Sequence, residues 1–279
     1  MAKETPEFFM RRAISLSRRG FPHPNPHVGC VIVANGAIVG EGWHEVYGGP
    51  HAEVVALKDA GLKAKGATAY VTLEPCNHTG RTGPCTQALL AAGVAKVVYA
   101  CSDPNPVASG GGLYLSKAGV EVESGLLEDK ARAENLRFLR AQELGRPYVI
   151  AKAGMSLDGK IALPSGESQW ITGEAARKAA HQLRAEVGAI VVGRGTVESD
   201  NPLLTARIPG VRHQPLRVVL DPGKRLTGIG QVFDQSAETL WLTADGPVPA
   251  KEGKFDLAAL MALLWERGIN GILVEGGGT

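Results

Sequence analysis

Four residues in the first third of the chain have the types and order of a zinc site that activates water. They are His51, Glu53, Cys76 and Cys85. Zinc binds imidazole nitrogen and thiolate sulfur, and three protein ligands leave its fourth tetrahedral position open for water. Zinc also lowers the pKa of such a water to about 7. The pattern therefore predicts His51, Cys76 and Cys85 as metal ligands, and Glu53 as the catalytic group that carries protons.

The order of these residues and their neighbours in the sequence indicate which class of zinc enzyme this is. A histidine and a glutamate followed by Pro-Cys and a further cysteine are typical of zinc-dependent nucleobase deaminases. Here eight residues separate Cys76 from Cys85, where that signature usually has two. The alternative is a surface helix carrying His51 and Glu53 with two merely buried cysteines, and the joint pattern disfavours it. His78 is the nearby candidate for a fourth, structural ligand, and we favour a role for it in the loop or at the substrate.

Composition excludes several classes of protein. The 279 residues suffice for two domains, and 44% hydrophobic with 21% charged residues is ordinary for a globular protein. A net charge of +2 predicts no nucleic-acid partner, and the lack of a long apolar run predicts no membrane span. Cys30 and Cys101 lie in apolar, strand-like runs and are expected in the core. Without a disulfide framework, we expect a cytoplasmic protein.

Hydrophobic periodicity predicts an α/β protein with two domains, residues 1–145 and 146–279, joined near Gly145-Arg146-Pro147. The first domain is predicted to contain helices at 6–19, 52–60, 84–92, 111–118 and 126–141, and strands at 28–33, 37–41, 68–73, 96–101 and 120–123. Asn35-Gly36 predicts a hairpin turn between the first two strands. The second domain is predicted to contain strands at 148–153, 189–192, 216–220, 239–243 and 272–274, and helices at 173–184 and 257–266.

Two glycine-containing stretches of the second half, residues 153–160 and 192–196, are the kind of turn that lets backbone amides approach a phosphate. Neither is a dinucleotide-binding fingerprint, so a purely structural turn is an equal alternative. The sequence closes on Glu275-Gly276-Gly277-Gly278-Thr279 directly after a predicted buried strand. Since such a run normally opens a turn into a helix, we expect the natural protein to be longer than this chain.

Longer motifs make the chain resemble one family. Residues 23–30 (HPNPHVGC), 51–53 (HAE), 72–85 (TLEPCNHTGRTGPC), 103–106 (DPNP) and 110–113 (GGGL) are similar to those of the bifunctional riboflavin-biosynthesis deaminase/reductases. In the second half, residues 168–172 (SQWIT), 200–207 (DNPLLTAR) and 274–279 (VEGGGT) resemble that family's reductase domain. The resemblance implies a three-layer, cytidine-deaminase-like domain followed by a dihydrofolate-reductase-like domain, which we expect to be truncated in this chain.

The resemblance also implies site residues and cofactors, one zinc ion per chain and NADPH. Asn25 would contact the pyrimidine, although it could also be a simple turn residue between two prolines. The residues implied to line the dinucleotide are Gly154, Trp170, Thr196, Asp200, Gly276, Gly277, Gly278 and Thr279. Those implied to hold the substrate of the reductase are Ser168, Arg184, Leu204, Arg207 and Glu275. Trp170 as a core aromatic and Arg184 on a solvated helix face are the plain alternatives, and Lys152 is a candidate for polarising the reacting sugar carbon.

The family resemblance implies two reactions on a small pyrimidine ribotide phosphate. The first is deamination of 2,5-diamino-6-ribosylamino-4(3H)-pyrimidinone 5′-phosphate, and the second is reduction of its ribosyl side chain to ribityl by NADPH. A homo-oligomer is expected. One rival hypothesis is a nucleic-acid or free-base zinc deaminase with an appended non-reductase domain. Another is a zinc-stabilised binding module without activity, which the intact set of four zinc-site residues disfavours.

Overall fold

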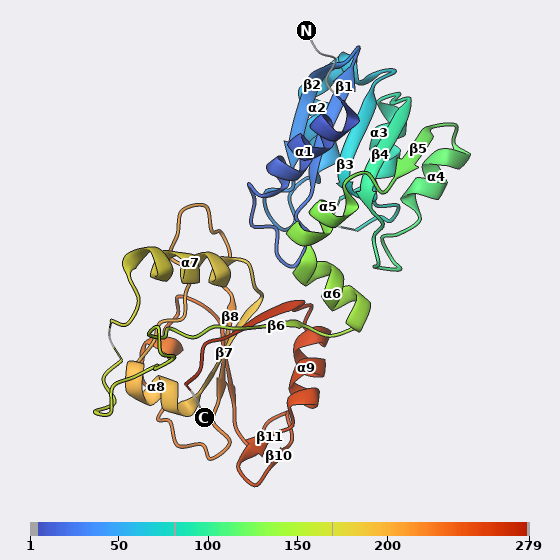
Figure 1. Cartoon of the computed structure of the whole chain (residues 1–279). Coiled ribbons are helices and arrows are strands. Elements are labelled where there is room, and N and C mark those ends of the chain that lie inside the picture. Colours follow the sequence, from blue (N-terminus) through green and yellow to red (C-terminus); the bar gives the residue numbers. More distant parts are fainter. Residues whose placement is uncertain (1–4, 81, 169, 278–279) are drawn as a thin grey trace. The chain divides into compact units, whose positions relative to one another are not determined.

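The computed structural model describes residues 5–80, 82–168 and 170–277. The chain divides into two compact units, residues 1–143 and 144–279 (Figure 1). None of the described helices is long and apolar enough to cross a membrane. Gly278 and Thr279, which the sequence places at the dinucleotide, lie outside the described residues.

The first unit is built on one five-stranded sheet in the order β2-β1-β3-β4-β5. Strand β1 pairs antiparallel with β2 and β3, and β3, β4 and β5 run parallel. The strands are β1 (Gly29–Ala34), β2 (Ala37–Trp43), β3 (Thr68–Leu73), β4 (Lys96–Cys101) and β5 (Glu121–Ser124). The helices are α1 (Pro6–Ser17), α2 (Ala52–Ala60), the short 3₁₀ turn η1 (Gly61–Ala64), α3 (Cys85–Ala91), α4 (Gly111–Lys117), α5 (Glu128–Glu134) and α6 (Leu136–Leu144).

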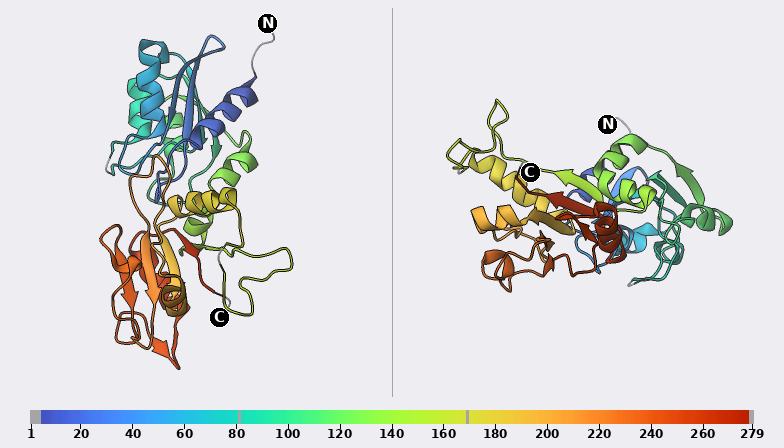
Figure 2. Two further views of the ribbon diagram at one scale, coloured as in Figure 1. Left: turned by 90° about the vertical axis from the view of Figure 1, so that its left-hand side faces the viewer. Right: turned by 90° about the horizontal axis from the view of Figure 1, so that it is seen from below.

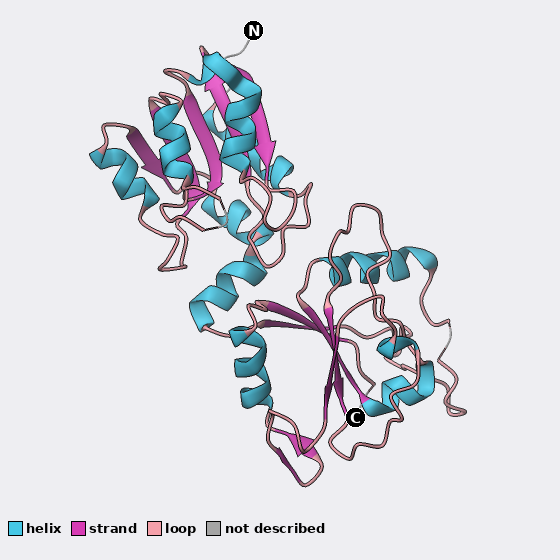
Figure 3. Ribbon diagram, turned by 180° about the vertical axis from the view of Figure 1, so that it is seen from behind, coloured by secondary structure: helices cyan, strands magenta, loops and turns pink. Residues whose placement is uncertain are grey.

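Helices cover both faces of this sheet, as the three-layer expectation requires. Helices α1 and α5 pack together on one face, while α2, α3 and α4 follow one another across the other (Figures 1 and 3). The three central strands β1, β3 and β4 are largely apolar and buried, as expected of strands covered on both sides, whereas the edge strand β5 is mostly exposed. Because β3 and β4 are parallel, the loops after Leu73 and Cys101 leave the sheet at the same edge. Cys76 lies in the first of these two loops, directly after β3.

Local sequence signals give most element bounds in this unit. Asn35 and Gly36 both have positive φ, at 53° and 76°, as a two-residue hairpin turn needs. The predicted single helix over 126–141 is wrong, since the structure has two helices that break at Asn135. Asn135 is 3% exposed, and its side chain exchanges two hydrogen bonds with the backbone of His27, from 2.7 to 2.8 Å. This long-range pairing holds Asn135 outside helical geometry.

The second unit contains an all-parallel five-stranded sheet in the order β6-β12-β7-β8-β9. Its strands are β6 (Tyr148–Ala151), β7 (Ala189–Gly193), β8 (Leu216–Leu220), β9 (Thr239–Leu242) and β12 (Gly271–Val274). Its helical elements are α7 (Glu174–Ala185), α8 (Arg194–Asp200), the short 3₁₀ turn η2 (Gln231–Phe233) and α9 (Leu257–Glu266), and β10 (Ala250–Lys251) pairs with β11 (Lys254–Phe255).

Two separate apolar cores flank this sheet. Leu260 and Leu264 of α9 pack on one face, and Leu183 of α7 and Val197 of α8 pack on the other. Figures 2 and 3 show the sheet between α9 on one side and α7 with α8 on the other. The glycine-containing stretch at 192–196, expected as a turn, instead ends β7 and begins α8. Val192 in this stretch and Val197 directly after it are buried in the same apolar cluster, which holds the chain as a helix over the sheet.

Arg217 is a fully buried cation that stabilises the loops of the second unit. It lies on β8 and pairs with Asp234 at 2.8 Å. Its other hydrogen bonds go to the carbonyl oxygens of Leu203, Gln231, Asp234 and Ala237 and to the hydroxyls of Ser236 and Thr239. One guanidinium therefore joins the segment before Leu204 to the segment at 231–239.

Arg217→Met is expected to reduce the free energy of unfolding of the second unit by about 3–5 kcal/mol, because it leaves several buried acceptors without donors. Urea unfolding followed by circular dichroism measures the change. Arg267→Met is the matched control, since Arg267 is exposed and lies 3.9 Å from Glu238. We expect the control to change stability by less than about 1 kcal/mol. Equal losses in the two variants would contradict the assigned role of Arg217.

Candidate active sites

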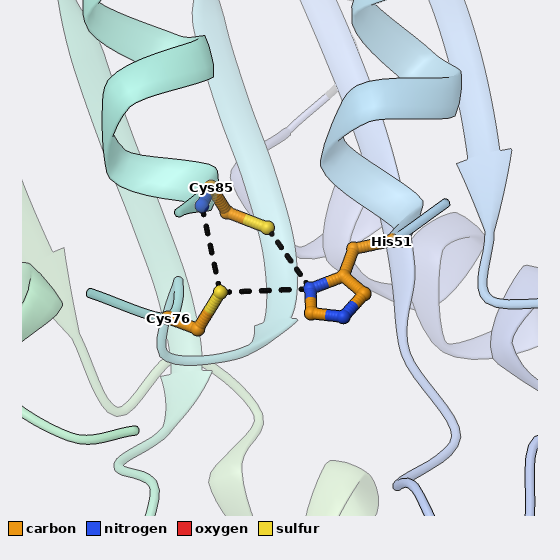
Figure 4. Close-up of side chains that lie close together, drawn as sticks. All are labelled: His51, Cys76 and Cys85. Carbon is orange, nitrogen blue, oxygen red and sulfur yellow. Dashed lines mark hydrogen bonds between the residues drawn. The ribbon is translucent and has the colours of Figure 1, made fainter. Parts of the chain in front are cut away.

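Three elements of the first unit bring the predicted zinc ligands together. His51 is the N-cap residue of α2, and Glu53 lies in the first turn of that helix. Cys76 lies in the loop after β3, and Cys85 is the first residue of α3, with Pro84 as its N-cap. Figure 4 shows the three side chains converging, with Nδ1 of His51 directed at both sulfurs.

The three ligand atoms have a spacing that fits one zinc ion. Nδ1 of His51 lies 3.2 Å from Sγ of Cys85 and 3.5 Å from Sγ of Cys76, and all three atoms fall within 4.8 Å of one another. Ligands of a tetrahedral zinc ion stand about 3.6 Å apart, given metal–ligand bonds of about 2.0–2.3 Å. Among the described residues, the group contains three possible ligands, and His78 is not one of them. That count is typical of a catalytic rather than a structural site.

The surroundings favour a thiolate on Cys76. The backbone N–H of Cys85, at the start of α3, donates to Sγ of Cys76 at 3.4 Å. The pKa of Cys76 is lowered to about 4, mainly by the hydrogen bond with the thiol of Cys85 and further by His51. The pKa of His51 is raised by its hydrogen bond with Cys76, against the effect of burial. A metal ion at this position would hold both sulfurs as thiolates.

Glu53, the predicted proton carrier, is buried beside the predicted zinc ligands. It is 3% exposed, and burial raises its pKa, with the negative charge of Cys76 adding to the increase. A raised pKa makes a carboxyl group a better proton acceptor than an ordinary glutamate.

A cavity of about 260 Å³ opens next to the zinc ligands. The predicted residues Asn25, His51, Glu53 and Cys76 line it together, and the contact of Asn25 with a pyrimidine stays a prediction. Sequence reasoning gave no individual role to several other lining residues. They include His44, Tyr47, Asp103, Asn105 and Phe138.

Two of these residues could have been found from the sequence, because they are polar and directly follow a predicted strand. Asp103 and Asn105 follow β4, whose carboxyl end lies beside that of β3, and polar residues at such an edge are site candidates. Burial raises the pKa of Asp103 to about 6, and Glu74 and Cys76 add to the increase. Phe138 had no such signal, because only the tertiary fold brings α6 to this cavity.

Close packing fixes the loop that presents Cys76. A Cβ atom on Gly111 would stand 1.7 Å from the carbonyl oxygen of Pro75, so only glycine lets α4 approach this loop. Glu74 accepts hydrogen bonds from the backbone of Gly112 at 3.0 Å and of Asp103 at 3.3 Å. The Gly-Gly-Gly motif at 110–112 therefore packs against the loop that carries Cys76 and helps to fix its position.

A cluster of charged residues lies at the carboxyl edge of the second sheet. Glu275, directly after β12, pairs with Arg184 of α7 through two hydrogen bonds of 2.6 and 2.7 Å. Lys152, directly after β6, lies 2.9 Å from the same carboxylate. Burial alone would raise the pKa of Glu275, but Arg184 and Lys152 lower it overall. The cluster therefore holds an ionised carboxylate between two cations.

This pairing refines the predicted roles of the two arginines. Arg184 has a side chain that is only 14% exposed, so it does not lie on a solvated helix face. Its charge is matched by Glu275. Arg207 donates to the hydroxyl of Thr205 at 3.1 Å and, within the described residues, pairs with no carboxylate. Its guanidinium is therefore not neutralised by a carboxylate of the described residues, and its contact with a substrate phosphate stays a prediction.

The other predicted residues of the second unit differ in how the structure supports them. Leu204 is 2% exposed as a whole residue and packs in the core, so little of it is open to a ligand. Trp170 is 73% exposed and lies over Arg177, so it is not a core aromatic. In the described residues, no hydrogen bond or ion pair joins the remaining predicted positions to Glu275. They are Gly154, Ser168, Thr196, Asp200, Gly276 and Gly277.

Most of these positions share one edge of the sheet. Gly154 follows β6, Thr196 and Asp200 lie on α8 after β7, and Gly276 and Gly277 follow β12. Ligands of parallel sheets bind outside the carboxyl ends of the strands. A Cβ atom on Gly193, Gly195, Gly276 or Gly277 would meet no atom within 4 Å, so open space lies next to this backbone. The arrangement fits an extended ligand such as a dinucleotide.

Comparisons with known proteins match both units. Residues 3–101 match the family model described as the cytidine and deoxycytidylate deaminase zinc-binding region, and residues 147–279 match the RibD C-terminal domain. The chain is 46% identical over 300 aligned residues to the riboflavin biosynthesis protein RibD of Escherichia coli K12. This alignment covers 98% of this chain and 82% of that protein. The chain is 44% identical to RibD of Aquifex aeolicus, covering 99% of this chain and 82% of that protein.

Two solved structures are similar to this chain over nearly its whole length. A structure of RibD from Acinetobacter baumannii has a TM-score of 0.88 at 44% identity and covers 97% of this chain and 80% of that one. A diaminohydroxyphosphoribosylaminopyrimidine deaminase/5-amino-6-(5-phosphoribosylamino)uracil reductase from Thermotoga maritima has a TM-score of 0.87 at 38% identity, and covers 98% and 80% of the two chains. With a zinc-binding deaminase unit followed by a reductase unit, the chain belongs to the RibD family of riboflavin biosynthesis proteins.

Proposed function

We propose that this chain catalyses two steps of riboflavin biosynthesis on a small pyrimidine ribotide. The first unit deaminates 2,5-diamino-6-ribosylamino-4(3H)-pyrimidinone 5′-phosphate, and the second reduces the ribosyl side chain to ribityl with NADPH. The observation that carries the proposal is the three-ligand group His51, Cys76 and Cys85, with Glu53 beside it in a cavity. Family membership favours this free ribotide over the nucleic-acid alternative.

In the deamination, His51, Cys76 and Cys85 would hold zinc, which when bound makes water a nucleophile near neutral pH. Water adds its oxygen to the ring carbon that bears the 2-amino group, and that amino group leaves as ammonia. Glu53 takes a proton from the water and delivers protons to the ring nitrogen and to the leaving group. Its burial excludes bulk water from this transfer.

In the reduction, NADPH supplies a hydride to the sugar carbon, and the protein supplies position and charge. We assign Gly154, Trp170, Thr196, Asp200, Gly276 and Gly277 to the dinucleotide, and Ser168, Arg184, Leu204, Arg207 and Glu275 to the substrate. Lys152 would stand at the reacting carbon, with Glu275 holding its ammonium in place at 2.9 Å.

Glu275→Gln tests the reductase assignment. Glutamine keeps the shape of the side chain but removes the charge that holds both Lys152 and Arg184. We expect NADPH oxidation with the deaminated ribotide to fall by about 10²-fold, while ammonia release from the first substrate stays unchanged. Glu238→Gln is the control, because Glu238 belongs to the same unit and its side chain is 77% exposed. Unchanged NADPH oxidation in Glu275→Gln would refute the assignment.

We further propose that the protein works in the cytoplasm as a homo-oligomer. In support, all four cysteines are free and two of them are predicted metal ligands, which suits a reducing compartment. Strand β6 lies at the edge of its sheet, and Val149 on it is 42% exposed, so a strand edge is open to pairing. Light scattering on the eluting protein measures the oligomeric state, and a monomer at working concentration would contradict the proposal.

A further inference from the structure

We propose that His44 is a positioning residue of the deamination site. It holds the side-chain amide of Asn25 in one orientation, so that the site accepts a ring edge on which an N–H lies beside a carbonyl. The inference rests on the proposed deamination and adds the residue that sets its selectivity for the ring.

The protonation of His44 follows from its partners. Nδ1 lies 3.0 Å from the carbonyl oxygen of Pro50, which can only accept a hydrogen bond. Nδ1 must therefore carry the hydrogen. In a neutral imidazole the other ring nitrogen is then an acceptor, so Nε2 offers a lone pair.

That lone pair determines how the amide of Asn25 is turned. Nδ2 of Asn25 lies 2.9 Å from Nε2 of His44 and donates to it. The opposite rotamer would bring Oδ1 against the Nε2 lone pair, an acceptor against an acceptor. The chain from the Pro50 carbonyl through His44 to Asn25 thus has one consistent direction.

Both residues are held firmly by the backbone. His44 is 2% exposed, and its N–H donates to the carbonyl oxygen of Val28 at 2.9 Å. The N–H of Asn25 donates to the carbonyl oxygen of Pro22 at 2.9 Å, and Asn135 fixes the same loop through His27. The amide can therefore keep its orientation before a ligand enters the cavity that Asn25 and His44 both line.

The orientation leaves a defined edge for the ligand. With one hydrogen of Nδ2 given to His44, Asn25 still offers Oδ1 and the second hydrogen beside it. An acceptor beside a donor complements a lactam edge, in which N–H lies beside C=O. The 4(3H)-pyrimidinone ring of the proposed substrate has such an edge, whereas a cytosine-type edge places an acceptor beside an amino group. A buried mismatch of this kind leaves polar groups unpaired and is strongly selected against.

A first test measures the hydrogen-bond direction directly. In the zinc-loaded protein labelled with ¹⁵N-histidine, the signals of His44 are assigned by their loss in His44→Gln. We expect a protonated Nδ1 and an unprotonated Nε2 at neutral pH. A proton on Nε2 would overturn the proposal, and this measurement does not depend on any enzymatic activity.

A second test separates positioning from a general structural role. We expect His44→Leu to raise KM for the ribotide about tenfold with kcat within about threefold, because it removes the partner of Asn25. In the Asn25→Ala background the same change should have less than about a twofold effect. His44→Gln keeps an acceptor near the position of Nε2 and should recover most of the affinity. Equal losses in both backgrounds, or loss of zinc in His44→Leu, would assign His44 a structural role instead.

A third test addresses the ring edge with two small competitive inhibitors. 2-Aminopyrimidin-4(3H)-one presents the lactam edge, and 2,4-diaminopyrimidine presents the reversed edge. We expect the wild type to bind the first about tenfold more tightly, and His44→Leu to lose this preference. A preference that persists in His44→Leu would refute the assigned role. If the wild type released no ammonia from the ribotide, the proposed function would fail, and the NMR result would still decide the orientation.

Discussion

Replacing Glu53 with glutamine is expected to lower kcat for ammonia release by about 10²–10⁴-fold while zinc stays bound. Glutamine has nearly the same shape as glutamate but cannot take a proton from water or return it to the ring. The residue is 3% exposed and has a raised pKa, so no bulk solvent is positioned to replace it. Stopped-time ammonia assays and metal analysis on the same sample measure both quantities.

The control for this change is Glu121→Gln, which removes an exposed carboxylate from β5 in the same unit. It should leave kcat and zinc content unchanged. If Glu53→Gln retained wild-type ammonia release, the role of Glu53 would be lost even with zinc in place. If it lost zinc, the residue would act through the metal site rather than through proton transfer.

Cys85→Ala is expected to remove both zinc and deaminase activity. Only two of the three converging ligands remain, and a two-ligand site does not hold zinc against a chelator. We expect less than about one tenth of the wild-type zinc content after dialysis against a chelator, and no measurable ammonia release. Because the reductase residues belong to a separate unit, NADPH oxidation with the deaminated ribotide should be unchanged.

Cys101→Ala is the matched control for the thiol. Cys101 ends β4 and is fully buried, and its pKa is raised to about 12 by burial, so it remains a neutral thiol. Its replacement removes a sulfur of similar burial without touching the metal group. Full zinc retention in Cys85→Ala, or zinc loss in Cys101→Ala, would contradict the ligand assignment.

The zinc site could be predicted from the sequence because each of its parts is marked locally. His51 and Glu53 lie at a helix start, and a proline precedes each cysteine at the end of a loop. Strand β3 and helix α9 were predicted at their observed bounds for the same reason, since short-range periodicity and end signals decide them.

Features that depend on partners distant in the chain could not be predicted. The break at Asn135 depends on hydrogen bonds to His27, 108 positions earlier. The pairing of Arg184 with Glu275 joins residues 91 positions apart, so periodicity alone left Arg184 on a helix face. His44 is a single histidine in a loop, and its position between Pro50 and Asn25 is visible only in three dimensions.

The central claim is that the His51, Cys76 and Cys85 site deaminates a free pyrimidine ribotide. The most direct measurement is ammonia release by the zinc-loaded wild-type chain, with the ribotide and single-stranded RNA or DNA as separate substrates. We expect ammonia from the ribotide at one molecule per ring and none from the nucleic acids. Ammonia from nucleic acid with none from the ribotide would contradict the account.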